Sequence, residues 1–261
     1  QMVLSNYLKH DLPVAVSQFT KDMIVESGAK VDSRLGTNFA HQLTERVEIS
    51  FPAIDTTSYT DIAKNTHEVD QLLNNRGLER DGYVMFLSRI APAKGVDDLV
   101  HAYKSSELYG NKKLIICGNG PMKEEIQKLA AADQSILVLD DVSDEEKGAL
   151  MHGAFAYCLP SKPRPEFIET FGIAVAEKML AGGNGPVITT RTGGIPEATG
   201  GHCLEHEAGN IGELRECLNR AYFMTREERH ELSQRAKQFA LNFDRAAILS
   251  NLITRSKAVT A

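Results

Sequence analysis

The sequence lacks several features that define common protein classes. Its four cysteines form no CxxC pair, and its net charge is −6. Widely spaced cysteines, two of them in apolar strand-like runs, indicate reduced buried thiols. The acidic balance argues against a general binder of nucleic acid or of anionic membranes. Apolar runs long enough to cross a bilayer are also missing, and we therefore expect a cytoplasmic protein.

Familiar catalytic signatures are missing too. The sequence has no GxxxxGK[ST] phosphate loop and no Ser-His-Asp pattern with a nucleophile elbow. Residues 117–121, CGNGP, place two glycines after a strand-like run, but the third glycine of a dinucleotide fingerprint is absent, which argues against a nicotinamide dehydrogenase. His202 and His206 are four residues apart without a third ligand nearby, so surface or core histidines are favoured over a metal site.

Regular alternation of strands and helices is what the sequence does contain. Composition is ordinary for a folded protein of 261 residues, with 42% hydrophobic residues. Short apolar runs are separated by amphipathic segments, and they predict strands at 83–88, 113–118, 135–139, 155–161 and 186–190. This pattern predicts an α/β fold with a doubly wound, Rossmann-like parallel sheet.

Helix ends can be predicted from local signals. Ser143 with Glu146, and Thr225 with Glu228, have the spacing of capping boxes. Pro121 is predicted at the first position of a helix. Three further helices are expected at 210–224, 225–240 and about 244–257.

Cationic residues follow the first of these strands. Ligands bind beyond the carboxyl ends of the strands in such sheets, and Arg89 and Lys94 lie in the loop after 83–88. An arginine fork and a lysine ammonium can together neutralise a diphosphate. Solvated surface charges are the plainer alternative. Gly193-Gly194 is predicted to open a short helix and has the same ambiguity, because its amides could face a phosphate or sugar or form an ordinary tight turn.

The stretch PEFIETFGIAVAEKML, residues 165–180, contains the most informative pattern. An apolar helix is predicted to begin near Gly172, and Glu177 falls on its second turn among residues suited to burial, so this carboxylate needs a partner. Free amides at a helix start attract anions. With Glu169 before it and Glu177 after it, the helix start suits a diphosphate between hydroxyl-bearing groups, as in a nucleotide sugar. A surface loop followed by a core helix with one solvated glutamate is the alternative.

Six ordered segments resemble the retaining glycosyltransferases of family 4, which have the GT-B fold. The segments are FLSRIAPAKGVDDLVHAY, LIICGNGPMKEEI, DDVSDEEKGALM, CLPS, EFIETFGIAVAEKMLAGG and VITTRTGGIPEATGG. The resemblance runs from about Pro13 to about Asp244. It implies the C-terminal, donor-binding half of such an enzyme.

The resemblance also implies roles for particular residues. Arg89 and Lys94 are expected to bind the diphosphate, Glu169 the hydroxyls of the donor sugar, and Glu177 those of the ribose. Arg89, Lys94 and Glu169 are thus the expected catalytic residues. The other expected donor contacts are Gly118, Asn119, Gly120, Val142, Thr170, Phe171, Gly172 and Ile173, with Val142 near the base. The loop before Glu169 is longer than is usual in the family, which leaves Glu166 as an alternative first glutamate.

Three segments are expected from this resemblance. Residues 1–53 are interpreted as the last β-α unit of an acceptor domain with its crossover, 54–243 as the donor domain, and 244–261 as a helix crossing back toward the acceptor domain. Residues 56–80 suit a linker or an entry helix. We expect the sequence to be part of a longer protein, because residues 1–46 are too few to form an acceptor domain, and we expect little or no transfer by this segment alone.

The function expected from the resemblance is transfer of a sugar from a nucleoside diphosphate sugar with retention of configuration and without a metal or other cofactor. UDP is the first expected nucleotide and GDP the second. A catalytically incomplete nucleotide-sugar-binding module and a GT-B epimerase are the alternatives. The expected partners are a nucleotide sugar and an unspecified acceptor, with no nucleic acid. Any peripheral membrane association is expected only through the missing N-terminal domain. The sequence does not indicate an oligomeric state.

Overall fold

The computed structural model describes residues 2–62, 64–131 and 133–260, and all but the last two of these side chains. Residues 1, 63, 132 and 261, which belong to segments predicted from the sequence, lie outside the described residues. Close contacts divide the chain into two compact units, one formed by residues 1–54 with 243–261 and the other by residues 55–242. Each unit is described by itself.

The larger unit is built on a parallel sheet of six strands in the order β5-β4-β3-β6-β7-β8. The bounds of these strands are β3 Tyr83–Leu87, β4 Lys113–Cys117, β5 Ile136–Leu139, β6 Ala156–Leu159, β7 Val187–Thr190 and β8 Leu204–His206. From β3 to β5, each new strand is added on one side of β3. The chain then returns, and β6 pairs with β3 on its other side. The predicted doubly wound α/β fold is thereby confirmed.

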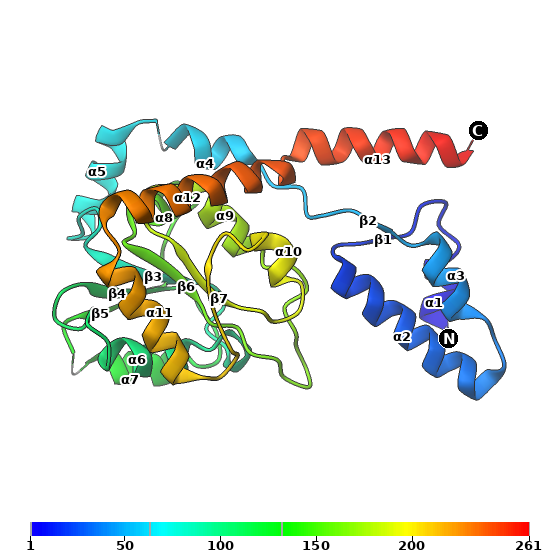
Figure 1. Ribbon diagram of the computed structural model, residues 1–261, viewed down its shortest axis with the longest axis horizontal. Coiled ribbons are helices and arrows are strands. Elements are labelled where there is room, and N and C mark those ends of the chain that lie inside the picture. The colour runs from blue at the N-terminus through cyan, green and yellow to red at the C-terminus, as the bar shows by residue number, and fades with distance from the viewer. Residues whose placement is uncertain (1, 63, 132, 261) are drawn as a thin grey trace. The chain divides into compact units, whose positions relative to one another are not determined.

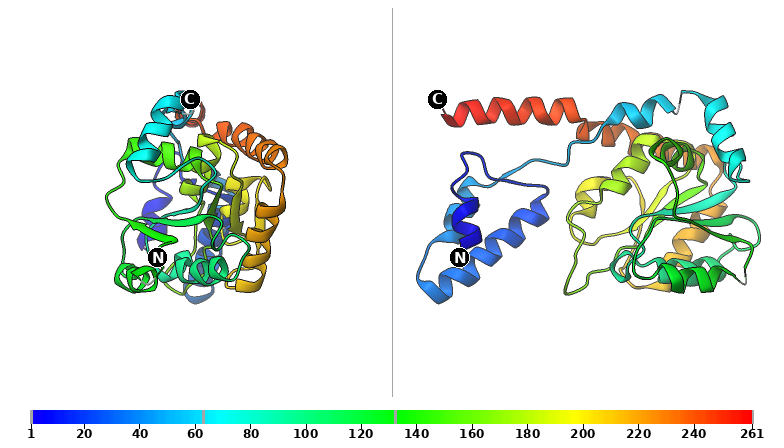
Figure 2. Two further views of the ribbon diagram at one scale, coloured as in Figure 1. Left: turned by 90° about the vertical axis from the view of Figure 1, so that its left-hand side faces the viewer. Right: turned by 180° about the vertical axis from the view of Figure 1, so that it is seen from behind.

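Helices cover both faces of this sheet (Figure 1, and from behind in Figure 2). One layer contains α4 Thr56–Ile62, α5 Thr66–Asn75, α8 Asp144–Gly153, α9 Ile173–Ala181 and α12 Arg226–Ala240. The other contains α6 Val96–Lys104, α7 Lys123–Ala131 and α11 Ile211–Phe223. The strands between them are almost wholly buried, which explains their nearly continuous apolar runs.

Local sequence signals set most of the helix boundaries. Both predicted capping boxes are present, at the starts of α8 and α12. Pro121, in contrast, does not open a helix as predicted, because α7 begins two residues later at Lys123. The intervening turn is held to the loop after β3, since the backbone N–H of Met122 donates to the carbonyl of Ile90 over 3.1 Å.

The short helix α10 Ile195–Thr199 begins directly after Gly193-Gly194, as the sequence predicts. Two other short elements were not resolved by the sequence pattern. The edge strand β8 has only three residues. The one-turn 3₁₀ helix η1 Pro92–Lys94 leads from the loop after β3 into α6. Each is too brief to produce a periodic signal of its own.

The smaller unit is mainly helical. It contains α1 Met2–Tyr7, β1 Val14–Ala15, α2 Gln18–Leu35, α3 Phe39–Arg46, β2 Glu48–Ile49 and α13 Arg245–Thr260, with η2 Leu241–Phe243 at its border. Its core is small and is formed by Leu8, Ala15, Phe39, Leu43 and Val47. An ion pair links Arg255 of α13 to Glu48 of β2. Within the described residues, no helix is long and apolar enough to span a membrane.

Candidate functional site

A cavity of about 270 Å³ opens at the carboxyl ends of β3, β4 and β5. Its lining residues are Leu87, Ser88, Arg89, Cys117, Gly118, Asn119, Asp140, Val142 and Lys147. Four of the sequence-predicted site residues therefore meet here, namely Arg89, Gly118, Asn119 and Val142. The cavity occupies the place where parallel sheets of this kind hold ligands.

Arg89 provides an available cation at this cavity. Its side chain is exposed and makes no ion pair or hydrogen bond to another residue that the structure describes. Gly118 and Gly120 keep the opposite loop close, because a Cβ atom on Gly118 would lie 2.0 Å from the carbonyl oxygen of Ser88. The loops after β3 and β4 therefore approach each other at a distance that only glycine permits.

Lys94 and Glu169 form an ion pair across two loops. Lys94 ends η1, and its ammonium lies 4.6 Å from the centroid of the Phe167 ring. Only 13% of the Lys94 side chain and 12% of the Glu169 side chain are exposed. Each charge is partly desolvated and satisfied by the other, so a phosphate could replace the carboxylate as the partner of the lysine.

The loop that contains Glu169 is fixed at several points. Lys162 binds Asp97 and Asp98 at the start of α6, with the closer contact to Asp98 at 2.8 Å. Nearer the carboxylate, the backbone N–H of Gly194 donates to the carbonyl of Glu169 over 2.9 Å. Glu166 is exposed, whereas Glu169 is enclosed and paired.

The Gly193-Gly194 turn packs against this same loop. Gly193 has a φ of +59°, and a Cβ atom there would lie 1.9 Å from the carbonyl oxygen of Glu169. A glycine is needed for both reasons, the positive φ and the close approach. The two glycines form a tight turn, and the amide of Gly194 already donates to the Glu169 carbonyl.

Helix α9 begins beside Glu169. Gly172 is its N-cap with a φ of +96°, and no described side chain caps the helix start. Phe171 is buried, whereas Thr170 and Ile173 are exposed. A helix start of this kind offers backbone amides and a positive dipole end to an anion.

Glu177 has the partner that its position requires. Its carboxylate accepts a hydrogen bond from Lys147 of α8 over 3.1 Å. Burial, and next the hydrogen bond to Glu177, raise the pKa of Tyr59 well above its usual range. Lys147 also lines the cavity, so this pair connects α9 to the cavity wall.

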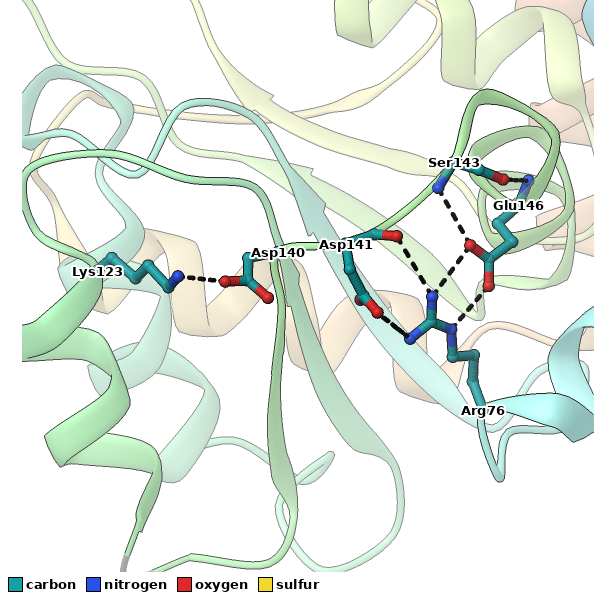
Figure 3. Close-up of polar contacts among 6 residues, drawn as sticks. All are labelled: Arg76, Lys123, Asp140, Asp141, Ser143 and Glu146. Carbon is teal, nitrogen blue, oxygen red and sulfur yellow. Dashed lines mark hydrogen bonds and ion pairs between the residues drawn. The ribbon is translucent and has the colours of Figure 1, made fainter.

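The loop between β5 and α8 forms another wall of the cavity and is held by ion pairs (Figure 3). Lys123 pairs with Asp140, and Arg76 binds Asp141 and Glu146 together. Arg76 is the C-cap residue of α5. The loop is thus attached to α7 through Lys123 and to the end of α5 through Arg76.

The histidines noted in the sequence lie apart from these residues. The Nδ1 of His206 lies 2.9 Å from the carbonyl oxygen of Glu207, and the His202 ring packs on Phe239 at 5.5 Å. Across the described ranges, no group of three or more histidine, cysteine, aspartate or glutamate side chains is placed to hold a metal ion.

Sequence reasoning missed Lys147 and Arg76. Glu177 was expected to need a partner, and Lys147 is a cation in the first half of α8, the helix that precedes α9 in the chain. It could have been suspected for this reason. Arg76 lies in the stretch interpreted as a linker, and no local pattern connects it to Glu146, which is 70 residues away. Long-range pairs of this kind require the strand order.

Comparison with known proteins identifies the family to which the chain belongs. Residues 70–239 match the family described as glycosyl transferases group 1. The fold is Rossmann-like and its structural neighbours include GT-B glycosyltransferases. The chain therefore belongs to the group 1 glycosyl transferase family.

Individual relatives are more distant. The chain is similar to the MMP alpha-(1->4)-mannosyltransferase of Mycolicibacterium hassiacum, with 29% identity over 160 residues, 59% of this chain and 37% of that protein. It is also similar to a GDP-mannose-dependent alpha-(1-6)-phosphatidylinositol monomannoside mannosyltransferase of Mycolicibacterium smegmatis, with 25% identity over 164 residues, 61% of this chain and 41% of that protein.

A solved structure, Anabaena HepE in complex with UDP and glucose, covers 95% of this chain and 63% of its own, with 19% identity and a TM-score of 0.74. At this identity the likeness shows the fold alone. The matches to the two curated relatives span about two fifths of their length.

Proposed function

We propose that this chain is the donor-binding part of a retaining glycosyltransferase of family 4 that takes its sugar from a nucleoside diphosphate. Arg89 and Lys94 bind the diphosphate, and Glu169 and Glu177 accept hydrogen bonds from the sugar and ribose hydroxyls. The base lies against Val142. UDP is the first expected nucleotide and GDP the second, and no metal is required. The acceptor is bound by a part of the protein outside residues 55–242.

The observation that carries this proposal is the cavity at the carboxyl ends of β3–β5, whose wall includes Arg89, a cation that no described residue pairs. A leaving diphosphate gains negative charge as the bond to the sugar breaks. Preorganised cations and helix amides stabilise such a charge strongly because they need no reorganisation. Family membership supports sugar transfer, and HepE, which shares the fold, was solved with UDP and glucose bound.

Calorimetric titration of the chain with UDP, GDP and UDP-glucose tests this proposal. We expect one diphosphate to bind at a single site, equally well with and without EDTA. Glu177→Ala is expected to weaken binding by about tenfold, because one hydrogen bond between a ribose hydroxyl and a charged group is lost.

Asp70→Ala is the matched control. Asp70 lies on α5 and forms an ion pair with Arg80, but neither residue lines the cavity. Nucleotide affinity is expected to be unchanged by this variant. Binding of no nucleotide, or equal weakening by Asp70→Ala and Glu177→Ala, would contradict the proposal.

A further inference from the structure

We propose that Arg76 is a positioning residue for the donor base, because it clamps the loop 140–143 that forms the base side of the cavity. This inference rests on the proposed function, since it concerns how the same site holds its nucleotide. Arg76 contributes no atom to the cavity wall, and its effect passes through Asp141 and Glu146.

The guanidinium of Arg76 holds two carboxylates at once (Figure 3). Its Nε donates to Glu146 over 2.7 Å and one terminal nitrogen donates to the other Glu146 oxygen over 3.0 Å. The second terminal nitrogen lies 3.0 and 3.1 Å from the two Asp141 oxygens. A planar fork in this arrangement fixes both the distance and the orientation of its partners.

The clamp connects three elements. Arg76 lies at the end of α5, Glu146 in the first turn of α8, and Asp141 in the loop between β5 and α8. Glu146 also completes the capping box with Ser143, accepting from its backbone N–H over 3.1 Å. One carboxylate therefore ties the helix start to the arginine, and the loop before it is held at its middle and its end.

Val142 lies within the clamped loop, but its own backbone groups are available to a ligand. It lies between Asp141 and Ser143, it lines the cavity, and its backbone N–H and C=O make no hydrogen bond to any residue in the described ranges. A peptide group with both its donor and its acceptor available can pair with the edge of a nucleobase. The position of this peptide depends on its two neighbours, and both are held by the clamp.

Electrostatics agree with a firm clamp. The hydrogen bond from Arg76 lowers the pKa of the Glu146 carboxyl to about 2, with the backbone bond from Ser143 as the next cause. The Glu146 side chain is 16% exposed and that of Arg76 is 21% exposed, so the pair is screened less than a fully solvated one. Asp141, in contrast, is mostly exposed and contributes orientation more than energy.

The test compares nucleotide and pyrophosphate binding by Arg76→Met and Arg76→Lys. Loss of the clamp lets the loop move, and ordering it again on binding weakens UDP or GDP by about tenfold. Pyrophosphate, measured by displacement of the bound nucleotide, is expected to keep its affinity because Arg89 and Lys94 are untouched. Arg76→Lys is expected to restore only part of the loss, since an ammonium cannot bind both carboxylates in one plane.

Arg80→Met is the matched control, because Arg80 lies four residues away and pairs with Asp70 instead. Glu146→Gln keeps a hydrogen-bonding side chain in the capping box and guards against an unfolded Arg76 variant. Hydrogen exchange of the unliganded proteins provides the second readout. We expect faster exchange at 141–143 in Arg76→Met and Glu146→Gln and no change in Arg80→Met.

The outcomes separate this inference from the proposed function. If the wild-type chain binds nucleotide, and Arg76→Met binds it equally well or loses pyrophosphate to the same extent, the positioning role is wrong and the proposed function stands. If the wild-type chain binds no nucleotide, the proposed function and this inference fall together.

Discussion

Two consecutive residues of α9, Glu177 and Lys178, lie in opposite environments. Glu177 faces the carboxyl end of the sheet, where it is paired with Lys147 at the edge of a cavity. Lys178 points toward the other end, is 1% exposed, and donates to the carbonyl of Gly182 over 2.6 Å. Burial lowers the pKa of Lys178 to about 7.

The difference teaches how one helix serves two purposes. At the carboxyl end, Glu169 is paired with Lys94 and Glu177 with Lys147. In the proposed function, a group of the ligand replaces one partner of each pair. At the amino end, the lysine is sealed against a backbone carbonyl, and no ligand can reach it. A charged residue at the first end is expected to affect binding, whereas one at the second is expected to affect stability.

At the carboxyl end of the sheet, Lys94→Met is expected to have the largest effect on nucleotide affinity. Nucleotide affinity should fall about a hundredfold because a partly buried charge contact is lost, and the free energy of unfolding should fall by about 2 kcal/mol because Glu169 is left without its partner. Calorimetry and chemical denaturation measure the two effects.

Arg89→Met gives the contrast for Lys94→Met. The Arg89 side chain is exposed and has no partner within the described part of the chain, so affinity should fall about tenfold while unfolding changes by less than about 0.5 kcal/mol. Equal loss of stability in the two variants would remove the distinction between a paired and an available cation.

Gly193→Ala tests the support of the same end. The added Cβ meets the carbonyl oxygen of Glu169 in a backbone with positive φ, and we expect unfolding to become easier by about 3 kcal/mol. Gly209→Ala separates the two causes, because Gly209 also has a positive φ, +78°, but has nothing within 4 Å of its added Cβ. It should lose only about 1 kcal/mol. Equal losses would show that the close approach has no cost.

Lys178→Met tests the buried lysine at the amino end and is expected to leave binding untouched. The folded state releases the Lys178 proton at about pH 7 and the unfolded state near 10.5, so wild-type stability should rise with pH between these values. The variant lacks this rise and should gain about 2 kcal/mol relative to wild type as pH falls from about 9 to about 7. Nucleotide affinity should be unchanged. A variant whose stability follows the wild-type pH curve would contradict the account.

Sequence patterns predicted the parts of this structure that depend on local signals. Residues close together in the chain predict both capping boxes and the five longer strands. They also predict that Glu177 needs a partner for its charge. The identity of that partner, Lys147, does not, because it depends on α8 and α9 packing in the same layer. Arg76 was hidden for the same reason. Pro121 misled because the turn after it is held by Ile90 of another loop.

A crystal structure of the chain with UDP or GDP tests the central claim most directly. We predict the diphosphate between Arg89 and Lys94 beside the start of α9, with Lys94 turned from Glu169 to phosphate and the base against 140–143. Nucleotide bound elsewhere on residues 55–242, with the Lys94–Glu169 pair intact, would contradict the assignment of this end of the sheet as the donor site.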